Sequence, residues 1–171
     1  AIVPISERLG EAMAVGLVMH VPLVLSRAGK ARSQALESAP SNSNENHVLV
    51  VIPTRDAVDD LVVMVRSLLN LAAQPSSLEI VVVDNGSQQS IVPEVFGDVC
   101  GAIVSVDRID EPFNWSRLNN LACKGRNQPI IVFANNDMEM LAAGWDDHLR
   151  SLLNMDQVGI VGARLLYPNG L

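Results

Sequence analysis

The chain has 171 residues, of which 49% are hydrophobic, so it can bury one substantial core. Its net charge of −7 and its isoelectric point near 4.8 disfavour nucleic acid or an anionic membrane surface as the main partner. Cys100 and Cys123 have neither the spacing of a zinc site nor a disulfide-rich pattern, which predicts two buried thiols in a reducing compartment.

Residues 1–46 precede the first strong strand signal. The apolar stretch at 12–25 is shorter than the ~20 residues that span a bilayer and lacks the basic flank of a signal peptide, so we expect no transmembrane segment here. Residues 33–46 are polar and poor in aromatic residues, which predicts a flexible linker. Because the chain starts at Ala1 and stops at Leu171, just after a Pro-Asn-Gly turn, we expect a piece of a longer protein.

From residue 48 onward, short β-branched runs alternate with segments of helical length. Strands are expected at 48–52, 78–83, 102–106, 130–134 and 158–161. The last of them should continue towards Tyr167. Helices are expected at 59–73, from an N-cap at Asn114 to about 124, and at 144–154, with a weak helix or turn at 92–99. This order predicts an α/β fold with an open, mainly parallel sheet flanked by helices. In the first helix one face carries Leu61, Val65, Leu68, Leu69 and Ala72.

Acidic residues follow three of the predicted strands: Asp56, Asp84 and Asp137. Because parallel strands end at one edge of a sheet, we expect these carboxylates to converge on one rim, where open α/β sheets bind ligands. Carboxylates with Asn and Ser around them suit a metal-bound phosphate or the sugar and base of a nucleotide. Local alternatives exist: Asp56 could cap the next helix, and Asp84 could begin an Asp-Asn-Gly-Ser turn.

Five segments in register resemble the glycosyltransferase family 2 domain, which has a GT-A fold. They are Ile-Pro-Thr-Arg-Asp at 52–56, Val-Asp-Asn-Gly-Ser at 83–87, Glu-Pro-Phe-Asn-Trp-Ser-Arg-Leu-Asn-Asn at 111–120, Asn-Asn-Asp-Met-Glu at 135–139 and Val-Gly-Ala-Arg-Leu-Leu-Tyr-Pro-Asn-Gly at 161–170. Within that family the chain looks most like bacterial rhamnosyltransferase-like enzymes of surface polysaccharide synthesis. The resemblance implies a truncated, nucleotide-binding part of the domain at 47–171, with 1–32 as the end of a preceding module or an extension.

The resemblance also implies roles for particular residues. The base and ribose of the donor would be held by Asp56 and Asp84, with Pro53 and Thr54 shaping the loop. The substrate-binding set would also include Arg55 and Asn85. Two further donor-side residues would be Arg117, which could meet a phosphate, and Asn120. The family's D-x-D metal motif corresponds to Asn135-x-Asp137, with Asp137 as the direct ligand of Mg²⁺ or Mn²⁺ and Glu139 as a helper. Asn135 and Asn136 would belong to the substrate-binding set.

This chain departs from the strict motif because Asn135 is neutral, although its amide oxygen can still bind a hard cation or a ribose hydroxyl. Two structural alternatives stand beside these assignments. The Asn-Asn-Asp segment could be a turn that caps the next element, and residues 114–120 could form a solvent-exposed helix face. Trp115 is expected in the core, because Phe113 and Leu118 flank it.

The implied reaction is inverting transfer of a sugar from a UDP- or dTDP-linked donor to a saccharide or lipid-linked acceptor. The catalytic base would lie beyond Leu171, so the fragment should be inactive alone, and it could self-associate through uncovered apolar surface. The implied location is the cytoplasm, including a peripheral position at the inner face of the membrane. One rival is a nucleotidyltransferase, which the absence of glycine at 53–56 disfavours. Another is a receiver-like regulatory module, which would need a lysine after the last strand, where Gly162-Ala163-Arg164 stands.

Overall fold

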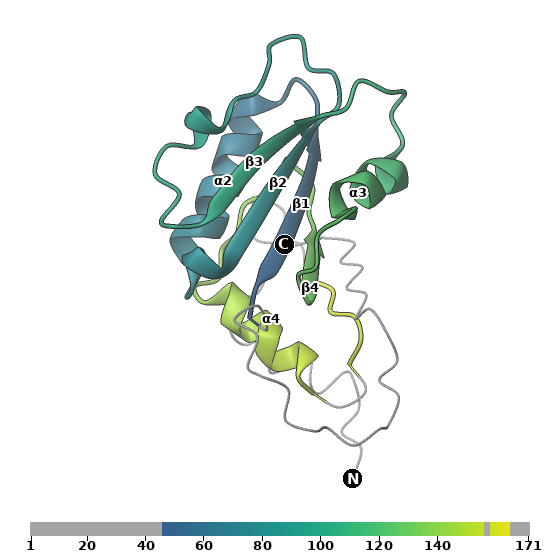
Figure 1. Ribbon diagram of the computed structural model, residues 1–171. Coiled ribbons are helices and arrows are strands. Elements are labelled where there is room, and N and C mark those ends of the chain that lie inside the picture. Colours follow the sequence, from purple (N-terminus) through teal and green to yellow (C-terminus); the bar gives the residue numbers. More distant parts are fainter. Residues whose placement is uncertain (1–45, 156–157, 165–171) are drawn as a thin grey trace.

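The structure is a computed structural model that describes residues 46–155 and 158–164 (Figure 1). The expected preceding module at 1–32 lies outside the described residues, as does all of the expected linker except Asn46. The far end of the expected last strand, near Tyr167, also lies outside them. Strands and helices follow one another in α/β order, which confirms the predicted fold class.

A four-stranded parallel sheet forms the centre of the domain, with strand order β3-β2-β1-β4. The strands are β1 Val48–Thr54, β2 Leu78–Asp84, β3 Ile103–Arg108 and β4 Ile130–Phe133. Every residue of β1 is buried, as expected for a β-branched strand that is paired on both sides and covered on both faces. Since all pairings are parallel, the four carboxyl ends lie at the same edge of the sheet. In Figure 1 the arrows of β2 and β3 end together at the top.

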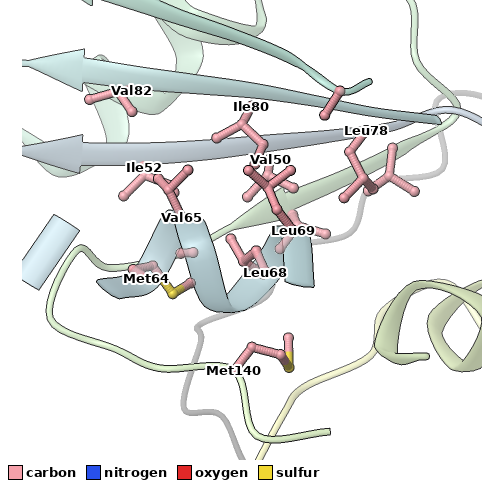
Figure 2. Close-up of a cluster of buried hydrophobic side chains, with 14 of the residues drawn as sticks. Val50, Ile52, Met64, Val65, Leu68, Leu69, Leu78, Ile80, Val82 and Met140 are labelled. Carbon is pink, nitrogen blue, oxygen red and sulfur yellow. The ribbon is translucent and has the colours of Figure 1, made fainter. Parts of the chain in front are cut away.

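Helix α2, Val58–Leu71, covers one face of the sheet. Its buried side chains contact the even-numbered strand residues, as Figure 2 shows for Val50, Ile52, Ile80 and Val82. The buried side chains of the helix are Leu61, Met64, Val65, Leu68 and Leu69. The predicted buried face of this helix is confirmed at Leu61, Val65, Leu68 and Leu69. Ala72 follows the end of the helix, and Met64 is buried although it was not predicted. Burying each such side chain contributes about 1.5–3 kcal/mol. The cluster on this face has more buried side chains than the cluster on the other face, so it is the main core.

Helix α3, Trp115–Cys123, covers the opposite face. Its Leu118 and Ala122 pack on the odd-numbered strand residues, and the Trp115 ring meets Phe133 edge-on with the ring centroids 5.9 Å apart. The predicted N-cap is confirmed, because the Asn114 side chain accepts a hydrogen bond from the backbone N–H of Arg117 at 3.0 Å. This cap fixes where the helix begins, at the carboxyl edge of the sheet.

Helix α4, Trp145–Leu153, closes the opposite, amino edge. The fully buried carboxylate of Asp146 accepts hydrogen bonds from the backbone N–H of Ala73 at 2.6 Å and from Arg150 at 2.8 Å. Arg150 in turn donates to the backbone oxygen of Asn46 at 2.9 Å. Trp145 donates from its indole to the backbone oxygen of Leu68 at 2.9 Å. These bonds tie the approach to β1, the end of α2 and α4 together.

Two short 3₁₀ helices complete the domain, Pro75–Ser77 (η1) and Pro93–Phe96 (η2), the second within the predicted helix or turn at 92–99. The predicted strand at 158–161 is wrong for the described residues, since 158–164 contain no strand. Val161 and Ala163 instead pack against the α2-side core. β-branched residues form a strand only where a neighbouring strand supplies hydrogen-bond partners. The apolar residues at 158–161 have no such partner strand, so they contribute to packing only.

The cysteine prediction is wrong in part. Cys100 is exposed, because it lies in the turn before β3 rather than in the core. Cys123 is half-buried at the end of α3, and burial raises the pKa of its thiol. Among the residues that the structure describes, no helix is long and apolar enough to cross a membrane.

Candidate functional site

The polar loops that follow β1, β2 and β4 lie at one edge of the sheet, as predicted. Thr54, the last residue of β1, is paired with Asp84, the last residue of β2. On the other side of β1, the side-chain amide of Asn136 donates to the Thr54 hydroxyl at 2.9 Å. Asp84 and Thr54 therefore lie side by side at the ends of β2 and β1, and Asn136, in the loop after β4, is bonded to Thr54. Pro53 is buried within β1, one residue before Thr54.

The loops after β1 and β2 are joined by hydrogen bonds around Asp56. Its backbone N–H donates to the Ser87 hydroxyl at 2.9 Å, and its carboxylate accepts from the backbone N–H of Gln88 at 2.7 Å. Asp56 has a positive φ of 56°. This conformation costs a non-glycine residue energy, and the hydrogen bonds around Asp56 offset that cost. The carboxylate is 44% exposed, and Arg55 lies 3.7 Å from its second oxygen. The capping alternative is wrong, because α2 has Ala57 at its N-cap position and no side-chain cap.

Asp84 is buried, and both of its carboxylate oxygens are bonded within the protein. One oxygen accepts from the backbone N–H of Ser87 at 2.9 Å, which confirms the predicted Asp-Asn-Gly-Ser turn. The other accepts from Arg108 at 2.8 Å, and Arg108 also donates to the backbone oxygen of Ser87 at 3.0 Å. With 1% of its side chain exposed, Asp84 organises the loop rather than offering a free carboxylate. Arg108 was not predicted as a site residue, and its only signal in the sequence is its position near the end of a predicted strand.

Asn85 fixes the loop that follows β3. Its side-chain amide donates to the backbone oxygens of Ile109 and Glu111, both at 2.8 Å, and the residue is 2% exposed. Gly86 follows it with a φ of 74°, and a Cβ atom there would lie 2.6 Å from a carboxylate oxygen of Asp110. Glycine adopts this backbone conformation without strain, and any larger residue would be strained there and would force the Asp110 side chain to move. Asn85 and Gly86 therefore bring the acidic segment 109–111 against the end of β2.

The first turn of α3 presents an exposed ion pair at the same edge. Arg117 donates to the two carboxylate oxygens of Glu111 at 2.5 and 3.0 Å. The hydrogen bond from Arg117 lowers the pKa of Glu111 and correspondingly raises the pKa of Arg117, so both groups are charged. Asn120 is exposed on α3. Its neighbour Asn119, which sequence analysis did not single out, is buried with its amide oxygen unpaired.

Residues 135–139 follow β4 and carry the expected metal-binding side chains. Asn135 and Asn136 are half-buried, whereas Asp137 and Glu139 are exposed and have no hydrogen bond or ion pair to another described residue. All four offer the oxygen donors that Mg²⁺ and Mn²⁺ prefer. Within 46–155 and 158–164, no three His, Cys, Asp or Glu side chains gather closely enough to hold a metal by themselves. A cation here would need further ligands from a bound phosphate or from water.

Comparison with known proteins gives a consistent family match. Residues 49–170 match the model of "Glycosyl transferase family 2". The chain is 38% identical over 125 residues to "Uncharacterized protein y4gI" of Sinorhizobium fredii, covering 72% of this chain and 14% of that protein. It is 35% identical over 127 residues to "O-antigen biosynthesis protein RfbC" of Myxococcus xanthus, covering 72% of this chain and 10% of that protein. The chain thus spans a small part of these curated relatives.

Solved structures share the fold. TarS 1-349 of S. aureus superposes with a TM-score of 0.55 at 16% identity, over 63% of this chain and 32% of TarS 1-349. The same protein in complex with UDP gives a TM-score of 0.52 at 18% identity, again over 63% of this chain and 32% of that chain. At these identities the likeness concerns the fold alone.

Proposed function

The chain belongs to glycosyl transferase family 2, and from this premise we propose that it supplies the donor side of sugar transfer in bacterial polysaccharide synthesis. The donor is a nucleoside-diphosphate sugar, UDP- or dTDP-linked, and the acceptor is a saccharide or a lipid-linked saccharide. The observation that carries this proposal is the family match over 49–170 together with the polar loops gathered at one edge of the sheet. The relative named for O-antigen biosynthesis and the TarS complexes with UDP and UDP-GlcNAc support it.

We assign the base and ribose of the donor to the joined loops after β1 and β2. Asp56 is the carboxylate best suited to direct contact, because it is 44% exposed whereas Asp84 is 1% exposed. Asp84 contributes by holding the 84–88 turn, and Arg108 fixes its orientation. An exposed carboxylate oxygen can accept hydrogen bonds from ribose hydroxyls or from the ring N–H of uracil or thymine.

We assign the diphosphate and its cation to the segment after β4. Asp137 is the direct ligand, with Asn135 and Glu139 as further oxygen donors. Mg²⁺ is commonly held by one or two carboxylates together with substrate phosphates, which fits a site that lacks three protein ligands. When bound, the cation offsets the charge that develops on the departing nucleoside diphosphate. Asp56, Asp137 and Glu139 make this edge acidic, so a cation is needed to reduce their repulsion of a diphosphate.

The acceptor hydroxyl attacks the anomeric carbon as the bond to the diphosphate breaks, and a general base takes the hydroxyl proton. We expect this base, and the acceptor-binding half of the domain, beyond Leu171. The 171-residue chain should therefore bind nucleotide weakly and should not transfer sugar, whereas a longer chain should do both. An assay with a labelled nucleotide-sugar and an oligosaccharide acceptor tests this. Robust turnover by the 171-residue chain would mean that Asp110, Glu111 or Glu139 serves as the general base.

A thermal-shift panel tests the donor site more directly. The chain is heated with UDP, dTDP or GDP, each with and without Mn²⁺. A ligand that binds only the folded state raises stability by RT ln(1 + [L]/Kd), which is about 2.7 kcal/mol at a hundredfold excess over Kd. We expect a metal-dependent rise with UDP or dTDP. Equal melting temperatures across the whole panel would remove the support for a nucleotide site in this chain.

A further inference from the structure

Arg55, Arg108 and Arg117 lie at the carboxyl edge, and they differ in how their guanidinium groups are bonded. Arg108 is bonded to the buried Asp84. If Arg108 moved away, the Asp84 carboxylate would be left buried and unpaired, which is costly. Arg55 is 62% exposed, and its Nε atom lies 3.7 Å from a carboxylate oxygen of Asp56, too far for a hydrogen bond. Arg117 makes a two-bond contact with Glu111, and both side chains are solvent-accessible, at 56% and 38%.

We propose that Glu111 is an internal competitor for the donor's diphosphate. Its carboxylate is bonded to Arg117 in the free chain and leaves when a nucleoside diphosphate binds there. Trp115 of α3 meets Phe133, the last residue of β4, so Arg117 belongs to the helix turn that adjoins the segment assigned to the diphosphate. This inference rests on the proposed function and adds a determinant of donor affinity to it. It follows from chemistry: a carboxylate and a phosphate each offer two oxygens to the edge of a guanidinium formed by Nε–H and Nη2–H. Glu111 already occupies that edge of Arg117, so a phosphate that binds the same edge displaces it.

A hydrogen bond to its backbone oxygen keeps Glu111 beside Arg117. The backbone oxygen of Glu111 accepts from Asn85, the residue directly after Asp84, so the peptide stays fixed while the side chain is free to turn away. Arg117 is likewise fixed at its backbone by the Asn114 cap. The exchange therefore needs only two side-chain rotations. Because the pair lies in water, it is weak and screened, and a more highly charged diphosphate can replace it.

Calorimetry on the 171-residue chain with Mn²⁺ tests this inference. The titrants are UDP and uridine, or the dTDP pair if dTDP binds better. Glu111→Gln should tighten UDP binding by about three- to fivefold, the factor expected from losing a weak surface pair, and should leave uridine binding unchanged. Asp110→Asn is the matched control, because it removes the same charge from the adjacent residue, which has no bond to Arg117. Its effect should be clearly smaller.

A double-variant cycle completes the test. Arg117→Gln should weaken UDP binding, and adding Glu111→Gln to it should give no further gain. The inference is overturned if Glu111→Gln binds UDP no better than wild type, if Asp110→Asn gives the same gain, or if the gain persists without Arg117. In each of those cases the wild-type chain still binds UDP and the proposed function stands. A wild-type chain that binds none of the nucleotides would overturn both.

Discussion

Replacing Asp146 with alanine should destabilise the domain strongly. The side chain is fully buried and accepts hydrogen bonds from the backbone N–H groups of Ala73 at 2.6 Å and Gln74 at 3.0 Å, and from Arg150 at 2.8 Å. Removing one partner of a buried ion pair costs about 3–5 kcal/mol. Arg150 keeps a second carboxylate, Asp147, at 2.9 Å, so we expect the lower end of that range, about 3 kcal/mol.

Urea unfolding followed by circular dichroism measures this loss. With an m value of about 2 kcal/mol/M, a loss of about 3 kcal/mol lowers the unfolding midpoint by about 1.5 M. Asp147→Ala is the matched control, because its side chain is 51% exposed and exposed ion pairs contribute about 0–1 kcal/mol. If Asp146→Ala and Asp147→Ala unfolded at the same urea concentration, burial would not be the source of the effect and our reasoning would be wrong.

The same contact gives the fold a pH dependence. Burial disfavours the ionised form of Asp146, but hydrogen bonds from Arg150, Ala73 and Gln74 outweigh it and hold the pKa of this carboxyl below its usual value. A carboxyl with a lower pKa in the folded chain stabilises the fold above its unfolded pKa of about 3.9. That contribution is lost as the pH falls through the folded value. The stability difference between wild type and Asp146→Ala should be full at pH 7 and should shrink below about pH 4.

Three further outcomes are expected at the candidate site. Gly86→Ala should lower the melting temperature more than Gly125→Ala, because both residues have positive φ but only Gly86 has a neighbour, Asp110, where the Cβ would lie; equal losses would show that this neighbour moves freely. Asp137→Ala should abolish Mn²⁺-dependent nucleotide binding in calorimetry with an unchanged circular dichroism spectrum, and retained binding would retire the metal assignment. Asn135→Asp should tighten Mn²⁺ binding, because an anionic ligand replaces a neutral one, and weaker binding would place Asn135 outside the metal site.

The parallel direction of the strands and the edge at which the site lies could be predicted from the sequence, whereas the strand order β3-β2-β1-β4 was not predicted. Runs such as 48–52 and 78–83 lack polar alternation, which indicates strands buried on both faces and therefore a parallel sheet. Parallel strands joined by helices all end at the same edge, so Asp84 and Asp137 had to lie there once the strands were identified. The N-cap at Asn114 was equally readable, because capping depends on residues three positions apart.

The bonding of each polar side chain was decided by the tertiary structure. Asp84 was expected either to contact the donor or to begin a turn, and its bond to Arg108 from a neighbouring strand could not be predicted. Asp146 is bonded to Ala73, which is 73 residues away along the chain. Hydrophobic periodicity repeats within an element and can be read along the chain. A polar contact instead depends on distances across the fold and on the burial of both partners, and neither exists until the elements pack.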